Sequence, residues 1–153
     1  MPRFHWAFLI GPKAEAGKHV PGLRCHVKNP AITGWFYDEN KLQDVKCTVN
    51  LLVRILVAKI EDEKGLLTIL RETPVIQDDP SFTCRTWLAD ALMRISKAEP
   101  KVTGTSQLDW DKIEIKSRRY VEQKVAAGRY RDETQVLGPK PTWDLTSQKE
   151  IIA

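Results

Sequence analysis

No apolar run in the sequence approaches the roughly 18 to 20 residues that a helix needs to cross a bilayer. The first apolar run ends at Ile10 and is followed by Gly11 and Pro12. It is shorter than the hydrophobic region of a secretory signal, and no small-residue cleavage site follows it. We therefore expect a cytoplasmic protein without a membrane span.

Cysteine and histidine are both scarce, with three of each in 153 residues. An odd number of cysteines without a secretory signal favours free thiols in a reducing compartment. His19, Cys25 and His26 are too sparse to match the spacing of a zinc site. Phosphate-binding loops, dinucleotide-binding glycine motifs and zinc-protease motifs are also missing from the sequence. We therefore expect neither a metal ion nor an organic cofactor.

The positive charge of the chain is modest, with a formal net charge of +4. A dedicated nucleic-acid-binding domain is usually more basic, with its charge gathered on one face. The basic face of the helix predicted over residues 109–127 could contact phosphates, but Glu114 and Glu122 interrupt it, which favours a solvated face. We expect a small-molecule or acyl substrate and no nucleic-acid partner, and the sequence leaves the oligomeric state open.

The hydrophobic pattern predicts a single α+β domain over residues 1–130, with an antiparallel sheet packed against helices. Branched and aromatic residues predict strands over residues 3–10, 23–28 and 35–37. The first two of them are expected to pair as a hairpin with a long connection. Both faces of residues 47–60 are apolar, which predicts a buried or bent strand, with a helix as the alternative. Residues 131–153 are polar and contain Gly138, Pro139 and Pro141, so we expect an extended tail there.

Three segments have the pattern of amphipathic helices, at residues 62–71, 83–97 and 109–127. Ser106 is a candidate N-cap for the third of them. The second carries an apolar stripe that begins with a cysteine and comprises Cys84, Leu88, Ala91, Leu92 and Ile95.

Cys84 falls in the first turn of its predicted helix. Unpaired backbone N–H groups and the helix dipole favour negative charge at that position, and the thiolate is the nucleophilic form of cysteine. The alternative is a core residue, because cysteine is among the most often buried residue types and Cys84 belongs to the apolar stripe. Cys25 and Cys47 fall in predicted strands, where no helix terminus assists them.

Two of the three histidines, His5 and His26, fall within hydrophobic strands. An imidazole buried there needs a hydrogen-bond partner. A lone strand histidine is more often a satisfied core residue than a base, but a nucleophilic cysteine needs an imidazole in contact with it. The two histidines and Cys84 together therefore form a candidate catalytic set.

The order of these motifs resembles the permuted papain-like hydrolases of the lecithin:retinol acyltransferase type. That family has a His-Trp-Ala strand that ends in glycine, a second histidine on the next strand, and a cysteine at the start of a later helix. His5, Trp6 and Ala7 through Gly11 match the first element, and His26 matches the second. Cys84, with Trp87 and Leu88 after it, matches the third. The chain also resembles an uncharacterised group of fungal proteins.

The resemblance implies a permuted papain-like fold and a cysteine-dependent hydrolase or acyltransferase that acts on an amide, ester or thioester. Cys84 would be the nucleophile, His5 the base, and His26 the group that orients His5. Trp6, Trp35 and Trp87 are candidate substrate-binding residues, although the segment around Trp35 is more typical of core or of a strand end.

Two alternatives remain open at this point. Thr83 stands where the family has asparagine, and Arg85 and Thr86 stand where it has glutamate and histidine. These departures fit a catalytically silent binding protein on the same fold. The second alternative is an isopeptidase that acts on a protein modifier, for which a broad groove leading to Cys84 would be expected.

Overall fold

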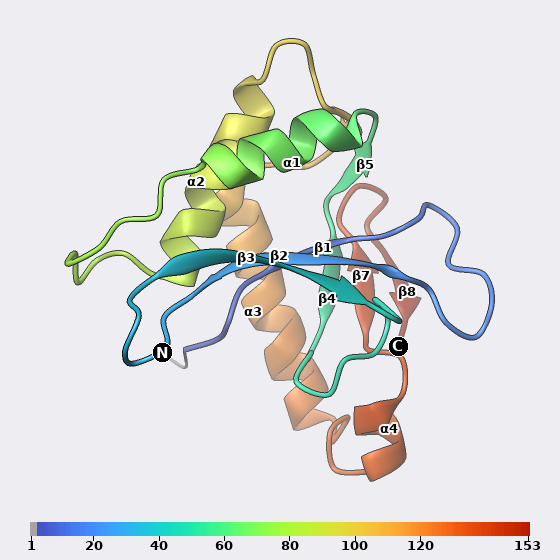
Figure 1. Cartoon of the computed structure of the whole chain (residues 1–153). Helices are drawn as coiled ribbons and strands as arrows, with labels where there is room; N and C mark the ends of the chain where they lie inside the picture. Colours follow the sequence, from blue (N-terminus) through green and yellow to red (C-terminus); the bar gives the residue numbers. More distant parts are fainter. Residues whose placement is uncertain (1–2) are drawn as a thin grey trace. The chain divides into compact units, whose positions relative to one another are not determined.

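The structure is a computed structural model that describes residues 3–153 (Figure 1). Over these residues it is an α+β protein with four helices and three small sheets. None of these helices combines the length and the apolar character required to span a membrane. The chain divides into two compact units, one formed by the residues up to Val45 with Ile60–Val102, the other by Lys46–Lys59 with Thr103–Ala153.

The elements of the first unit are β1 (Phe8–Ile10), β2 (Gly22–Lys28), β3 (Phe36–Leu42), α1 (Glu63–Glu72) and α2 (Cys84–Lys97). The second unit contains β4 (Arg54–Leu56), β6 (Thr103–Ser106), α3 (Trp110–Ala126), α4 (Glu133–Leu137), β7 (Thr142–Asp144) and β8 (Lys149–Ile152). The remaining strand, β5 (Ala58–Ile60), pairs with β6.

The sheet of the first unit is antiparallel, with β2 between β1 and β3. The predicted pairing of the first two strands is confirmed, but β1 is shorter than expected. Only Phe8–Ile10 align with partners on β2, so the segment that contains His5 and Trp6 precedes the strand. β3 is longer than expected, because it pairs with β2 along seven residues.

The helices of the first unit lie where the sequence predicts them. α1 begins after the N-cap Asp62, and α2 begins after the N-cap Thr83. Figure 1 shows both helices on the same side of the β1–β2–β3 sheet, and α2 packs against β2. The whole predicted stripe of α2 from Cys84 to Ile95 is buried, as is Trp87 beside it.

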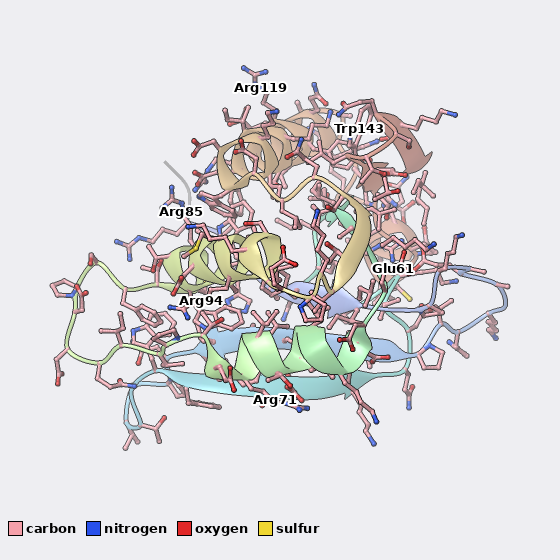
Figure 2. All side chains as sticks on the ribbon, turned by 90° about the horizontal axis from the view of Figure 1, so that it is seen from above. Glu61, Arg71, Arg85, Arg94, Arg119 and Trp143 are labelled. Atoms are coloured by element: carbon pink, nitrogen blue, oxygen red, sulfur yellow. The ribbon has the colours of Figure 1, made fainter. Side chains whose placement is uncertain are left out.

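An ion pair joins α1 to the sheet. The guanidinium of Arg71 donates to both carboxylate oxygens of Glu39 on β3, at 2.8 and 2.9 Å. Figure 2 shows Arg71 on α1, which is drawn over the strands of this sheet. Glu39 therefore lies on the helix-covered face, together with Cys25, its partner in the β2–β3 register.

The two faces of β2 carry different chemistry, because successive side chains of a strand point to opposite sides. Cys25 and Val27 are fully buried on the face covered by the helices. Their partners in the register, Phe8 on β1 and Tyr37 on β3, contact the indole of Trp87. Arg24 and His26 consequently lie on the opposite face.

The segment 47–60 does not form the single strand or the helix that its apolar pattern suggests. It forms two three-residue strands, β4 and β5, that are separated at Val57. The chain changes hydrogen-bonding partner there, because the carbonyl of Leu56 accepts from Leu145 and the carbonyl of Val57 accepts from Gln107. Of the three expectations for this segment, the bent strand comes closest to the two short strands that the structure shows.

Residues 131–153, for which the sequence predicts an extended tail, instead contain α4, β7 and β8. β7 pairs in parallel with β4 and antiparallel with β8, so the polar segment supplies two strands of a three-stranded sheet. Ser106 does not cap α3, because it ends β6; Asp109 is the N-cap and accepts from the N–H groups of Asp111 and Lys112.

A buried lysine joins two segments of the second unit. Lys140 is 1% exposed, and its Nζ donates to the carbonyl oxygens of Leu51 at 2.8 Å, Thr48 at 2.9 Å and Val49 at 3.4 Å. Its backbone N–H donates to the carbonyl of Lys46. Desolvation lowers the pKa of the Lys140 ammonium, and the three carbonyl oxygens satisfy its N–H groups.

Replacement of this lysine is expected to destabilise the second unit. Lys140→Met removes the hydrogen-bond donors of three carbonyls, which we expect to lower the free energy of unfolding by about 2 to 4 kcal/mol. Lys149→Met is the matched control, because Lys149 is exposed on β8 and its replacement should change stability by less than about 0.5 kcal/mol. Urea denaturation followed by circular dichroism measures both. Equal stability of the two variants would contradict a structural role for the Lys140 contacts.

Candidate active site

Cys84 is the first residue of α2, and local sequence determines that position. Thr83 has extended backbone dihedrals and accepts a hydrogen bond from the N–H of Thr86, while the Thr86 hydroxyl accepts from the N–H of Thr83. This reciprocal capping arrangement fixes where the helix begins. Thr83 is therefore a competent N-cap.

The thiol of Cys84 lies at the edge of the core. The residue is 9% exposed, and its Sγ is 3.9 Å from the carbonyl oxygen of Phe4. Phe4 directly precedes His5, so the structure brings the thiol to the backbone of the segment that carries this histidine. Over residues 3–153 no hydrogen bond connects the Cys84 thiol to either imidazole.

The structure brings His5 and His26 into direct contact. His5 Nε2 lies 2.6 Å from His26 Nδ1, and the two rings meet edge to face with their centroids 4.9 Å apart. His26 belongs to β2 and is 4% exposed, whereas His5 lies in the segment before β1 and is exposed. The buried strand histidine is thus hydrogen-bonded, as its burial requires.

Two residues of β3 complete the polar group on this face of the sheet. Asp38 is the partner of His26 in the β2–β3 register, and Asn40 is the partner of Arg24. His26 Nε2 lies 3.3 Å from Asn40 Oδ1 and 3.4 Å from Asp38 Oδ2. We call His5, His26, Asp38 and Asn40 the histidine cluster.

The partners of the cluster define the tautomers of its two neutral imidazoles. Asn40 Oδ1 faces the Nη2 donor of Arg24 at 3.4 Å, which assigns oxygen rather than nitrogen to that side of the amide. Both partners of His26 Nε2 are therefore acceptors, so His26 carries its proton on Nε2 and accepts through Nδ1. His5 must then donate from Nε2, which leaves its Nδ1 lone pair unprotonated.

Burial and neighbouring cations favour the neutral form of both imidazoles. Desolvation of its ring lowers the pKa of His5 although the residue is partly accessible, and the positive charges of Arg24 and Lys28 act in the same direction. Desolvation also lowers the pKa of His26, with smaller contributions from His5 and Arg24, while Asn40 and Asp38 oppose the shift. The hydrogen bond from Lys28 lowers the pKa of Asp38, which is thus a carboxylate at neutral pH.

The three candidate substrate-binding tryptophans have different environments. Trp87 is 1% exposed, packs against Phe8 and Tyr37, and donates from its indole to the carbonyl of Thr73. It is a core residue, and its burial leaves no surface for a substrate. Trp6 and Trp35 are both partly exposed.

Trp35 lies close to the start of α2. Its indole meets the ring of Phe82 edge to face at 5.3 Å, and Phe82 is two residues before Cys84. The side-chain amide of Gln77 bonds both the N–H and the carbonyl of Trp35, which holds this residue to the loop between α1 and α2. Trp35 is thus linked to the start of α2 through Phe82.

The sequence did not identify Asp38 and Asn40 as site residues. The signal in the sequence is that Asp38 and Asn40 stand two residues apart in Phe36–Leu42, so that they share one face of a strand. This spacing points to a site only when the register with His26 is known. Among residues 3–153, no three or more histidine, cysteine or acidic side chains are grouped so that they could hold a metal ion.

The tautomers are open to direct measurement. In long-range ¹⁵N–¹H NMR spectra at neutral pH, His5 and His26 should both appear as Nε2–H tautomers, because acceptors face His26 Nε2. Asn40→Asp should preserve this pattern, whereas Asn40→Leu should broaden or shift the His26 resonances. A proton on Nδ1 of His26 in the unmodified protein would mean that His26 donates to His5, and it would contradict the assignment.

The stability of the protein should fall as the pH is lowered from about 7 to about 5. In the unfolded chain both imidazoles take up protons as the pH passes their ordinary pKa of 6.5, while the lowered pKa values delay protonation in the folded protein. The unfolded state then binds more protons, and the free energy of unfolding decreases. Denaturant titrations at several pH values should show a smaller decrease for a His5→Gln/His26→Gln double variant, and an equal decrease would contradict the pKa directions.

The chain belongs to a family of proteins whose function is not known. Residues 1–152 match the model of this family, described as "Family of unknown function (DUF6914)". No curated protein and no solved structure matches the chain.

Proposed function

We propose that this member of the family is a cysteine-dependent hydrolase or acyltransferase in which Cys84 is the nucleophile, His5 the general base and His26 the group that orients His5. The substrate carries an amide, ester or thioester carbonyl. The observation that carries the proposal is the hydrogen-bonded pair of His5 and His26, next to the segment that meets the Cys84 thiol.

The finer fold assignment is part of the same proposal. We infer a permuted papain-like arrangement, in which the histidine-bearing segments precede the cysteine helix in the chain. The support is the order His5, His26, Cys84, the position of His26 on the central strand, and the packing of α2 against that strand. The resemblance to the lecithin:retinol acyltransferase type rests on the same three residues together with their neighbours Trp6, Trp87 and Leu88.

The histidine cluster supplies the proton chemistry that acyl transfer needs. With its Nε2–H directed at His26, His5 has a free lone pair on Nδ1. In the structure the Cys84 thiol contacts the Phe4 carbonyl and His26 lies on the sheet face opposite α2, so the proposal requires the segment that carries His5 to move until Nδ1 meets the thiol. The thiol proton moves to Nδ1, and the resulting imidazolium keeps its hydrogen bond to His26, which is itself held by Asp38 and Asn40. The lowered pKa of His5 keeps this base unprotonated at neutral pH.

The covalent steps are those of acyl transfer through a thioester intermediate. The thiolate sulfur bonds to the carbonyl carbon, and the carbonyl electron pair moves to oxygen. When the pair returns, the bond to the alcohol, amine or thiol breaks, and the leaving group takes the proton from His5. Water or an acceptor next attacks the thioester, loses its proton to His5 and releases Cys84. The backbone N–H of Cys84, at a helix start without an intrahelical partner, would stabilise the oxyanion.

A second candidate function has its own support. Cys84 is 9% exposed, and its thiol has a backbone carbonyl rather than an imidazole as its hydrogen-bond partner. These two observations fit a catalytically silent protein in which the cysteine is a core residue and the histidine cluster is structural. The two candidates differ in the reactivity of the thiol.

Alkylation of the folded protein distinguishes them. With iodoacetamide at neutral pH, Cys84 should label much faster than Cys25, whose thiol is fully buried and has a pKa raised by burial to about 11. His5→Gln should slow the labelling of Cys84 by about tenfold or more, because the thiolate then loses its base. His19→Gln, in an exposed loop of the same unit, is the matched control and should leave the rate unchanged. Peptide mass spectrometry assigns each labelled thiol.

A second readout follows the acyl group itself. Incubation with p-nitrophenyl acetate should give an acetyl group on Cys84 and a burst of p-nitrophenolate, both of which Cys84→Ser should abolish. Labelling of Cys84 only after unfolding, with no acetylated intermediate, would exclude the enzyme and leave the silent protein.

A further inference from the structure

A pocket of about 400 Å³ lies on the second unit, and the proposed chemistry does not use it. α3 forms one wall, and the turn between β7 and β8 contributes Leu145 and a glutamine. Its volume is within the range of small-molecule sites.

Three cations from one stripe of α3 line this pocket. Lys112, Lys116 and Arg119 are spaced by four and three residues, which places them on one face of the helix. Three glutamine amides and the apolar side chains of Ile115 and Leu145 complete the lining, which includes no carboxylate. We call this site the basic pocket.

The basic pocket differs from the rest of α3 in its charge balance. Two other cations of α3 form ion pairs: Arg118 lies 3.0 Å from the carboxylate of Glu114, and Lys124 lies 2.9 Å from that of Glu150. Among residues 3–153 no acidic side chain forms an ion pair with the three pocket cations. Glu150 interacts with Lys116 only at longer range, since Tyr120 and Lys124 contribute more to the lowered pKa of its carboxyl.

Lys116 is held in position rather than free in solvent. Its Nζ lies 3.5 Å from the centre of the Trp143 ring and 5.6 Å from the centre of the Tyr120 ring. These cation–π contacts orient the ammonium without neutralising its charge. Figure 2 labels Trp143, a residue of β7, and shows the Arg119 side chain projecting outward from α3.

We propose that the basic pocket binds a small organic molecule through a phosphate group. A phosphate monoester carries a charge of about −1.5 to −2 at pH 7 and has three acceptor oxygens, which match two lysines and an arginine better than a single carboxylate does. The glutamine amides would bond further oxygens, and Ile115 with Leu145 would contact the organic part. A solvated helix face, which the sequence favours, would not by itself explain why three cations without an ion-pair partner line one concave site.

Titration with adenosine monophosphate, followed by two-dimensional ¹⁵N NMR, tests the proposal. We expect shifts of α3 and of the β7–β8 turn with a Kd of about 1 mM or tighter, and no shifts with adenosine, which lacks the phosphate. Lys112→Gln/Lys116→Gln/Arg119→Gln should weaken binding by about tenfold or more, equivalent to about 1.4 kcal/mol.

The matched control is Lys13→Gln/Lys18→Gln/Lys41→Gln, because these lysines are exposed in the first unit and their loss changes the net charge equally. The control variant should bind as the unmodified protein does. Equal weakening in both triple variants would show a general charge effect and overturn the site.

Vesicles of phosphatidylcholine with phosphatidic acid distinguish the source of the phosphate. One outcome is that the protein binds these vesicles but not the nucleotide, with binding lost in the pocket triple variant and kept in the control variant. That result assigns a lipid-borne phosphate to the basic pocket. Binding to neither probe overturns the proposal. The substituted pocket residues belong to the second unit, whereas Cys84 belongs to the first. Failure of the phosphate proposal would therefore say nothing about the proposed thiol chemistry, which the alkylation experiment tests separately.

Discussion

The register between β2 and β3 is the constraint on which the first unit depends. It places Cys25 and Val27 beneath α2 and His26 opposite Asp38 on the other face. A shift by one residue would exchange the faces and bring an imidazole and a guanidinium into the apolar contact with Trp87. Burial of the core and assembly of the histidine cluster are therefore enforced by one set of backbone hydrogen bonds.

The start of α2 could be predicted because its determinants are local. The stripe of apolar residues at helical spacing is visible in the sequence, and all five of its members are buried as predicted. The pairing of the first two strands was predictable for a similar reason. Nothing in the sequence tests the role assigned to Cys84 or the resemblance to papain-like enzymes, and both remain proposals.

Other features depend on contacts between distant segments, which one sequence does not reveal. The polar residues after 131 gave no apolar pattern, yet β7 forms because its backbone groups pair with β4 and β8. The hydrophobic run over 47–60 suggested one strand, but its two halves bond to different partners. Asp38 and Asn40 belong to the candidate site because the β2–β3 register places them next to His26. Lysine at position 140 would be expected on the surface, and only the surrounding carbonyls explain its burial.

The parallel pairing of β4 with β7 has a consequence for the order in which the protein is made. Arg54 and Thr142, which bond through their side chains as well as their strands, are 88 residues apart. On the ribosome, all residues of the first unit have been synthesised once Val102 is added, while Lys46–Lys59 still lacks the strand that β4 pairs with. The nascent chain must therefore carry an apolar segment through most of its synthesis, a period in which chaperones have access to it.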